Sequence, residues 1–188
     1  MKTYLFPAIR LTFLTMILFG IFYPFFIVGV SKLIAPENGN GEIIVVNSKT
    51  VGFDLIGQLF TDDKYFNSRP SAVNYNAASS GGSNKGPSNR EYLNLVQERL
   101  DDFLEKNPGL TKDEVPMDLI TASASGLDPH ISRNAALVQV SRIANARGLS
   151  KEVVHSLVDQ YTQPPLFGLF GPSTVHVLRI NIALDNIK

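Results

Sequence analysis

The longest stretch without a charged residue lies near the start of the chain and constrains the fold most. No charged side chain occurs between Arg10 and Lys32, and the residues between them are mainly Leu, Ile, Phe and Val. At about 1.5 Å per residue a helix of this length spans about 31 Å, which matches the hydrocarbon core of a bilayer, about 30 Å. The sequence therefore predicts one transmembrane helix over residues 11–33, after a short N-terminus of residues 1–10.

A cleaved signal peptide and a buried core helix are the alternatives for this run. The apolar part of a signal peptide holds only about 7–15 residues and precedes a cleavage site of small residues. Here Leu33 stands where a small residue belongs, and Pro36 follows directly after the apolar segment. We therefore interpret the run as an uncleaved anchor. Pro24 lies inside it and is expected to kink the helix, because proline leaves a carbonyl one turn earlier without its donor.

The charges flanking the predicted helix favour a cytoplasmic N-terminus. Lys2, Arg10 and the free amine lie before the helix, and Lys32 is the nearby cation after it. Positive flanks tend to stay inside, so we expect a single-pass protein of the cell (inner) membrane whose main domain is extracytoplasmic. All 17 acidic residues and all but three of the 17 basic residues follow position 35, which leaves that part with a net charge of −3. Such a balance argues against nucleic acid as a partner.

The remaining chain is predicted to form a linker, residues 34–41, and a single mixed α/β domain, residues 42–188. Glu42–Val46 is predicted to be a buried strand that returns, after a turn at Asn47–Lys49, as the second arm of a hairpin. Residues 61–90 lack periodicity and are rich in Asn, Ser, Gly and Pro. So long a loop is usually functional or disordered. The chain has no Cys, so its core has to provide the stability.

Three helices are predicted after this loop, each with an N-terminal serine and a C-terminal stop. They run from Ser88 to Asn107-Pro108-Gly109, from Ser132 to Arg147-Gly148, and from Ser150 to Pro164. Ser88 and Glu91 have the spacing of a capping box. Met117–Thr121 is predicted to be a strand, and Thr174–Leu184 a strand with a helix as the alternative. The predicted fold class is α+β: one N-terminal transmembrane helix followed by this domain.

A glycine-rich stretch at Ser79–Pro87 is the first candidate site. Glycine-rich loops can bind phosphate through backbone amides. The P-loop pattern G-x-x-x-x-G-K-[ST] is absent, because Lys85 follows Asn84 and precedes a Gly-Pro pair. A loop that packs against a partner protein is the alternative. The candidate residues for docking or nucleotide binding are Gly81, Gly82, Ser83 and Asn84.

The segment 121–130 contains the second candidate set, Ser125, Gly126, Asp128 and His130. A serine, an aspartate and a histidine suggest a hydrolase, but the motifs G-x-S-x-G and S-x-x-K are absent. Asp128 next to proline is also an ordinary turn-forming residue. The chain has three His and no Cys, with no two His four residues apart, so we predict no metal site. We name no catalytic residue.

The order of many short motifs resembles the KdpC family, one of the subunit families of the Kdp-type potassium-transporting ATPase, a bacterial and archaeal high-affinity uptake pump. The resemblance covers almost the whole chain, and it departs from the family pattern only slightly, at Ala124, where glycine is usual, and at Arg133, where proline is common. It rests on the N-terminal anchor and on these segments, in order: Leu55–Gln58, Tyr65-Phe66, Arg69–Ala72, Tyr75-Asn76, Ser80–Asn84, Gly86-Pro87, Asn89, Val115-Pro116, Asp118–Ser123, Ser125–Ser132, Gln139-Val140, Ala146–Gly148, Val177-Leu178 and Leu184-Asp185.

The resemblance implies a non-catalytic accessory subunit that accompanies a potassium-binding channel-like subunit and a P-type ATPase subunit. Members of this family are described as catalytic chaperones that raise the affinity of the pump for ATP, and as nucleotide-binding. ATP is thus a candidate ligand, although we expect no firmly bound cofactor and an extracytoplasmic domain meets little ATP. Membrane lipid is the other expected partner. Two further classes stay open: a membrane-anchored extracytoplasmic hydrolase, based on Ser125, Asp128 and His130, and a sensor domain, based on the long polar loop.

Overall fold

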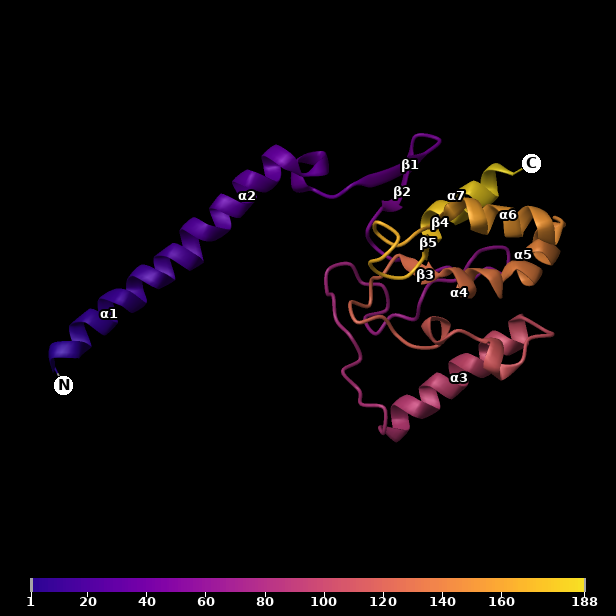
Figure 1. The fold of residues 1–188 in the computed structure, drawn as a ribbon, viewed down its shortest axis with the longest axis horizontal. Helices are drawn as coiled ribbons and strands as arrows, with labels where there is room; N and C mark the ends of the chain where they lie inside the picture. Colours follow the sequence, from indigo (N-terminus) through magenta and orange to yellow (C-terminus); the bar gives the residue numbers. More distant parts are fainter. Residues whose placement is uncertain (1, 188) are drawn as a thin grey trace. The chain divides into compact units, whose positions relative to one another are not determined.

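The computed structural model describes residues 2–187 and divides into two compact units (Figure 1). The first unit runs up to Asp54 and holds the apolar helix and a hairpin, and the second begins at Leu55. The second unit contains the mixed α/β fold and both candidate sites.

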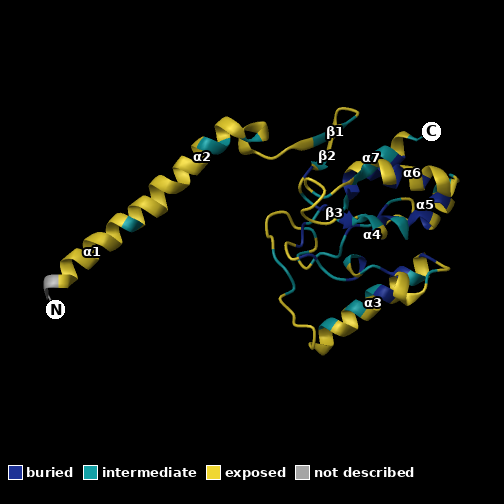
Figure 2. Cartoon of the chain, viewed as in Figure 1, coloured by how far each residue is buried: buried dark blue, intermediate teal, exposed yellow. Residues whose placement is uncertain are grey.

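The first unit begins with a helix that is long and apolar enough to cross a membrane, Tyr4–Ile34. It consists of α1 (Lys2–Ile17), a π-helical turn (Leu18–Phe22) and α2 (Tyr23–Ile34). In the π turn the amide of Tyr23 donates to the carbonyl of Leu18, five residues earlier. This change of hydrogen bonding lies just before Pro24, where a disturbance was expected, because the proline has no amide to donate. From Tyr4 to Ile34 no residue of the helix is buried and most are exposed (Figure 2).

A two-stranded hairpin follows the helix, as predicted. β1 (Ile43–Val46) pairs antiparallel with β2 (Lys49–Phe53), and Asn47 and Ser48 between them both have positive φ. Two such residues form the tight turn whose twist matches a hairpin. The prediction that the first strand is buried was wrong: Ile43 is 46% and Val45 58% exposed. Their sheet contains only these two strands, so nothing in the sheet itself covers them.

The second unit starts with residues 55–89, which we call the long loop. Within this described range it contains no helix or strand, which confirms the prediction for residues 61–90 except at Arg90, the first residue of the next helix. It is nevertheless part of the core, because Phe66 is fully buried. The Phe66 amide donates to Asn181 Oδ1 (2.8 Å), and Asn181 Nδ2 donates back to the Phe66 carbonyl (3.0 Å). The asparagine side chain therefore replaces the neighbouring strand that this backbone lacks.

A buried arginine also binds the long loop. Burial lowers the pKa of the Arg142 guanidinium, which makes its charge costly unless hydrogen bonds compensate. Gln139 provides one of these bonds with its Oε1, which also accepts from the Asn67 amide. All of the acceptors are neutral oxygens: Asp63 O, Tyr65 O, Asn67 Oδ1, Asn107 Oδ1 and Gln139 Oε1.

The predicted helices are present, with shifted ends. α3 (Arg90–Lys106) is capped by Asn89, which accepts from the Tyr92 amide, so Ser88 was the wrong cap by one residue. The helix predicted after Ser132 divides into α4 (Arg133–Leu137) and α5 (Val140–Arg147), and Gly148 ends it with φ 66°. α6 (Lys151–Tyr161) is capped by Ser150, as predicted.

The three-stranded sheet of this unit is short. β3 (His130–Ser132), β5 (Thr174–His176) and β4 (Thr162–Gln163) pair antiparallel in that order. The strand predicted at Met117–Thr121 was wrong, since Met117–Leu119 is a 3-10 turn. The strand predicted over Thr174–Leu184 was correct for Thr174–His176, and the helix given as the alternative is present from Val177, where α7 (Val177–Asn186) begins.

The core lies among α3–α7 and the sheet, and Figure 2 shows it as dark blue. Its largest fully buried apolar side chains are Phe66, Ile131, Ile143, Val154, Val158, Val175, Val177, Ile180 and Leu184.

Candidate functional site

The two candidate segments, which are separated in sequence by residues 88–120, lie against each other. The Gly81 amide donates to the Ser125 carbonyl (2.9 Å), and the Ser80 hydroxyl donates to the same oxygen (3.0 Å). A Cβ atom added at Gly82 would lie 2.9 Å from the Ala124 carbonyl oxygen. Gly81 and Gly82 are therefore packed onto the segment that contains Ser125, and no side chain fits at Gly82 without a shift of backbone.

Gly126 makes the contact reciprocal. Its φ of +69° is a conformation that favours glycine, and a Cβ here would lie 2.8 Å from the Gly81 carbonyl oxygen. The Gly126 carbonyl accepts from the Ser71 hydroxyl (2.6 Å), and the Ser123 amide donates to the Pro70 carbonyl (3.2 Å). The two glycine segments thus form one backbone-to-backbone junction, which we call the glycine junction (residues 80–82 and 123–126).

Gly57 extends this packing, and reasoning from residue types did not select it. Its amide donates to the Leu127 carbonyl (2.8 Å), and an added Cβ would lie 2.6 Å from the Asp128 carbonyl oxygen. The only sequence signal for this role was its place in the Leu55–Gln58 motif of the resemblance. Three separate segments therefore converge on residues 123–128.

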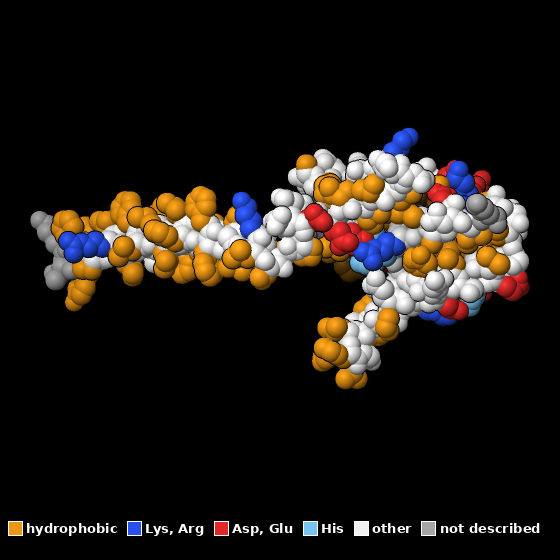
Figure 3. Space-filling model, turned by 90° about the horizontal axis from the view of Figure 1, so that it is seen from above, with side chains coloured by type: hydrophobic (Ala, Val, Ile, Leu, Met, Phe, Trp, Pro, Cys, Tyr) orange, Lys and Arg blue, Asp and Glu red, His pale blue; other side chains and the backbone are white. Residues whose placement is uncertain are grey.

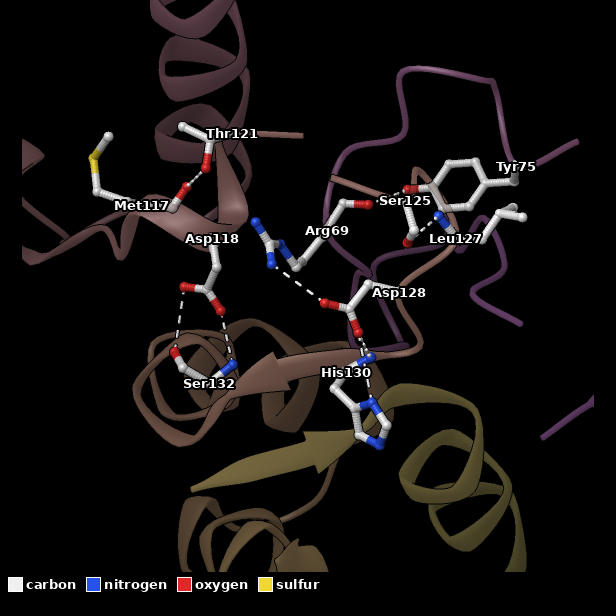
Figure 4. A network of polar contacts seen from close by, with 10 residues as sticks. All are labelled: Arg69, Tyr75, Met117, Asp118, Thr121, Ser125, Leu127, Asp128, His130 and Ser132. Carbon is white, nitrogen blue, oxygen red and sulfur yellow. Dashed lines mark hydrogen bonds and ion pairs between the residues drawn. The ribbon is translucent and has the colours of Figure 1, made fainter. Parts of the chain in front are cut away.

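Asp128 and His130 lie together but do not form a triad with Ser125 (Figure 4). Asp128 Oδ2 pairs with Arg69 Nη1 (3.2 Å), and its Oδ1 accepts from the His130 amide (3.0 Å) and lies 3.5 Å from His130 Nδ1. Burial opposes ionisation of Asp128, but hydrogen bonds from His130 and the charge of Arg69 outweigh it and keep the pKa of the carboxyl below its ordinary value. The Ser125 hydroxyl accepts from the Leu127 amide instead (3.1 Å).

Ser125 and Asp128 act here as turn-forming residues, because each side chain accepts a hydrogen bond from a backbone amide two residues further on. Among the hydrogen bonds of the described residues, Ser125 has none to Asp128 or His130, so its hydroxyl has no neighbouring base to activate it. The His130 ring instead meets the ring of buried His176 edge-on, 5.1 Å between centroids. Asp118, which we had not selected, fixes the next strand by accepting from the amide (2.7 Å) and hydroxyl (3.2 Å) of Ser132.

Ser83, which directly follows the glycine junction, lines a groove. The next residue, Asn84, has a positive φ of 50°. The groove has a volume of about 350 Å³ and is lined by Ser83, Lys85, Glu91, Tyr92, Asn94, Leu95 and Glu98. Lys85 forms an ion pair with Glu91, and that hydrogen bond lowers the pKa of Glu91. With two carboxylates and one paired lysine, the groove is negatively charged. Among residues 2–187, no three His, Asp or Glu side chains are grouped to hold a metal ion.

Arg133, one of the two positions that depart from the family pattern, has a local structural role. Arg133 Nη2 pairs with Asp159 Oδ1 (2.6 Å), and His155 Nδ1 lies 3.2 Å from Asp159 Oδ2. These contacts join the first turn of α4 to α6 on the exposed surface. Ala124, the other departure, lies in the glycine junction itself, where its carbonyl faces Gly82.

Comparison with known proteins gives the same assignment over the whole chain. The family model of the K+-transporting ATPase, c chain, matches residues 5–186. The potassium-transporting ATPase KdpC subunit of Flavobacterium psychrophilum is 52% identical over 184 residues, 98% of each chain. Its counterpart in Caldanaerobacter subterraneus subsp. tengcongensis is 47% identical over 182 residues, 96% of this chain and 94% of the other. That of Bacteroides fragilis is 45% identical over 190 residues, 100% of this chain and 99% of the other. The resemblance inferred from the motifs is confirmed, and the chain belongs to the KdpC family of K+-transporting ATPase subunits.

Proposed function

We propose that the chain is a non-catalytic, single-pass accessory subunit that stabilises a potassium pump and supports ATP binding by its P-type ATPase subunit through assembly. The partners in this proposal are that ATPase subunit and a potassium-binding channel-like subunit. The glycine junction acts in it as a docking surface and not as a nucleotide site. This choice rests on one observation: the Gly81 amide, which a phosphate would need as a donor, already donates a hydrogen bond to the Ser125 carbonyl.

The charges around the junction support docking over phosphate binding. A phosphate-binding loop presents free amides and a cation to its ligand. Here Lys85 is paired with Glu91, and Glu98 adds a second carboxylate to the same groove. A polyphosphate would have to break the ion pair and approach two negative charges.

Paired substitutions separate docking from nucleotide binding. Gly82→Val should reduce co-purification with the other pump subunits, because its side chain would strike the Ala124 carbonyl. Gly86→Val is the matched control, since nothing lies within 4 Å of a Cβ at that position. Lys85→Ala should leave assembly and potassium-dependent ATPase activity nearly intact, and the purified chain in detergent should show no saturable ATP binding.

A phosphate-binding lysine would behave differently. Its loss removes a charge-assisted hydrogen bond of roughly 1.5–3 kcal/mol, which weakens binding by about one to two orders of magnitude. Saturable ATP binding by the chain, weakened to that extent in Lys85→Ala, would refute the docking proposal. Circular dichroism of Gly82→Val shows whether the domain still folds.

The proposed topology places the N-terminus in the cytoplasm and the domain outside it. This proposal rests on the flanking charges of the apolar helix, Lys2 and Arg10 before it and Lys32 after it. A reporter enzyme that is active only in the cytoplasm, fused after residue 188, should be silent. Strong reporter activity would reverse the orientation and bring the domain into contact with cellular ATP.

A further inference from the structure

An exposed apolar loop joins β4 to β5, residues 164–172. Within this apolar loop Leu166, Phe167, Leu169 and Phe170 are 64%, 85%, 81% and 66% exposed. In Figure 3 a knob of hydrophobic side chains projects at the lower edge of the view. Exposed apolar patches on folded domains mark interaction sites for proteins or membranes.

The composition of the apolar loop favours lipid over a protein partner. From Pro164 to Pro172 each residue is Pro, Leu, Phe or Gly, and no Lys, Arg, Asp or Glu occurs between Asp159 and Arg179. Protein–protein interfaces have a polar rim and roughly one hydrogen bond per 100–200 Å². The loop offers no side-chain donor or acceptor for such bonds, whereas a bilayer requires none.

The backbone of the apolar loop also forms internal hydrogen bonds. These matter in an apolar medium, where an unpaired amide or carbonyl costs several kcal/mol. Leu166 and Phe170 exchange backbone hydrogen bonds in both directions (2.9 and 3.0 Å). The Gly168 amide donates to Pro165 O (2.8 Å) and the Leu169 amide to Leu166 O (3.1 Å). Three further positions are proline, which has no amide to satisfy.

We propose that the apolar loop inserts into the interfacial layer of the bilayer that holds the N-terminal helix, giving the domain a second, reversible membrane contact. The inference rests on the proposed membrane anchoring. Twenty residues separate Ile34 from Leu55, and an extended chain of that length reaches at most on the order of 70 Å, which sets the upper limit on the distance between the anchor and the start of the domain. The loop carries no cation, so a neutral phosphatidylcholine surface suffices for insertion.

The chain has no Cys, so single cysteines can be labelled cleanly in the full-length protein. A fluorophore on Leu169→Cys reports the apolar loop, one on Glu105→Cys reports an exposed polar position of α3, and one on Phe19→Cys reports the anchor. The protein is reconstituted in phosphatidylcholine vesicles. Quenching is measured with a nitroxide on the lipid acyl chain and with aqueous iodide.

The lipid nitroxide should quench the Leu169→Cys label at least about threefold more than the Glu105→Cys label, with iodide showing the reverse order. Adding Phe167→Ser and Phe170→Ser should return the Leu169→Cys label to the Glu105→Cys level. Equal iodide quenching at both positions would overturn the proposal. Protection only after the other pump subunits are added would overturn it as well, in favour of a protein partner.

The Phe19→Cys label distinguishes a failure of the proposed anchoring from a failure of the loop insertion. If lipid does not quench it, the proposed anchoring fails. If it is quenched and the Leu169→Cys label is not, only the insertion of the apolar loop fails. Association with the pump is read separately, by co-purification.

Discussion

The long loop and the apolar loop reverse the usual relation between composition and burial. The long loop is rich in Asn, Ser and Gly, yet Phe66 within it is fully buried and its backbone is bound by Asn181 and Arg142. The apolar loop consists of Leu, Phe, Pro and Gly, yet its large side chains are mostly exposed. Burial follows from the partners that a segment finds in the fold, because a polar backbone can be buried once its hydrogen bonds are made.

The largest expected effect compares one phenylalanine in each loop. Phe66→Ala should lower the free energy of unfolding by about 3–5 kcal/mol, because it leaves a cavity in the core. Phe170→Ala, at a 66% exposed position, should change it by less than about 0.5 kcal/mol. Urea unfolding of the full chain in detergent, followed by circular dichroism, measures both. Equal effects of the two substitutions would remove the contrast between the loops.

A smaller effect is expected from the arginine that holds the long loop. Arg142→Ala should cost about 2–3 kcal/mol of unfolding free energy, because buried carbonyl and amide oxygens lose a charged donor. Arg133→Ala is the control, since its pair with Asp159 is exposed and should contribute far less. Limited proteolysis of Arg142→Ala should show new cleavage within residues 61–68. If that segment stays protected, Asn181 and the core are enough to hold it.

The smallest expected effect concerns pH. The pKa of Asp128 lies below its ordinary value of 3.8, so its pairing with Arg69 and His130 stabilises the fold above the unfolded-state pKa. That contribution is lost as pH falls through the folded-state pKa, below about pH 4. Wild type should therefore lose more unfolding free energy than Asp128→Asn between pH 6 and pH 3. Parallel losses in the two proteins would show that Asp128 contributes nothing to acid sensitivity.

Local signals in the sequence predicted the elements whose cause is local. The apolar helix follows from length and absence of charge, the hairpin from Asn47-Ser48, and the caps of α4 and α6 from Ser132 and Ser150. Errors arose where another local cap competed. Asn89 displaced Ser88 as the cap of α3, and His176 ended β5 by capping α7 through its Nδ1, which accepts from the Arg179 amide.

The candidate site shows the same division. The sequence by itself determined that two glycine-containing motifs exist, that one apolar helix can cross a membrane, and, through the order of its motifs, the family. Only the tertiary structure decided that Gly81 and Gly82 pack on residues 123–126, that Gly57 joins them, and that Ser125 is apart from Asp128 and His130. The physical reason is range: caps and turns are fixed by residues within one helical turn, whereas these contacts join backbone groups that only the folded core brings together.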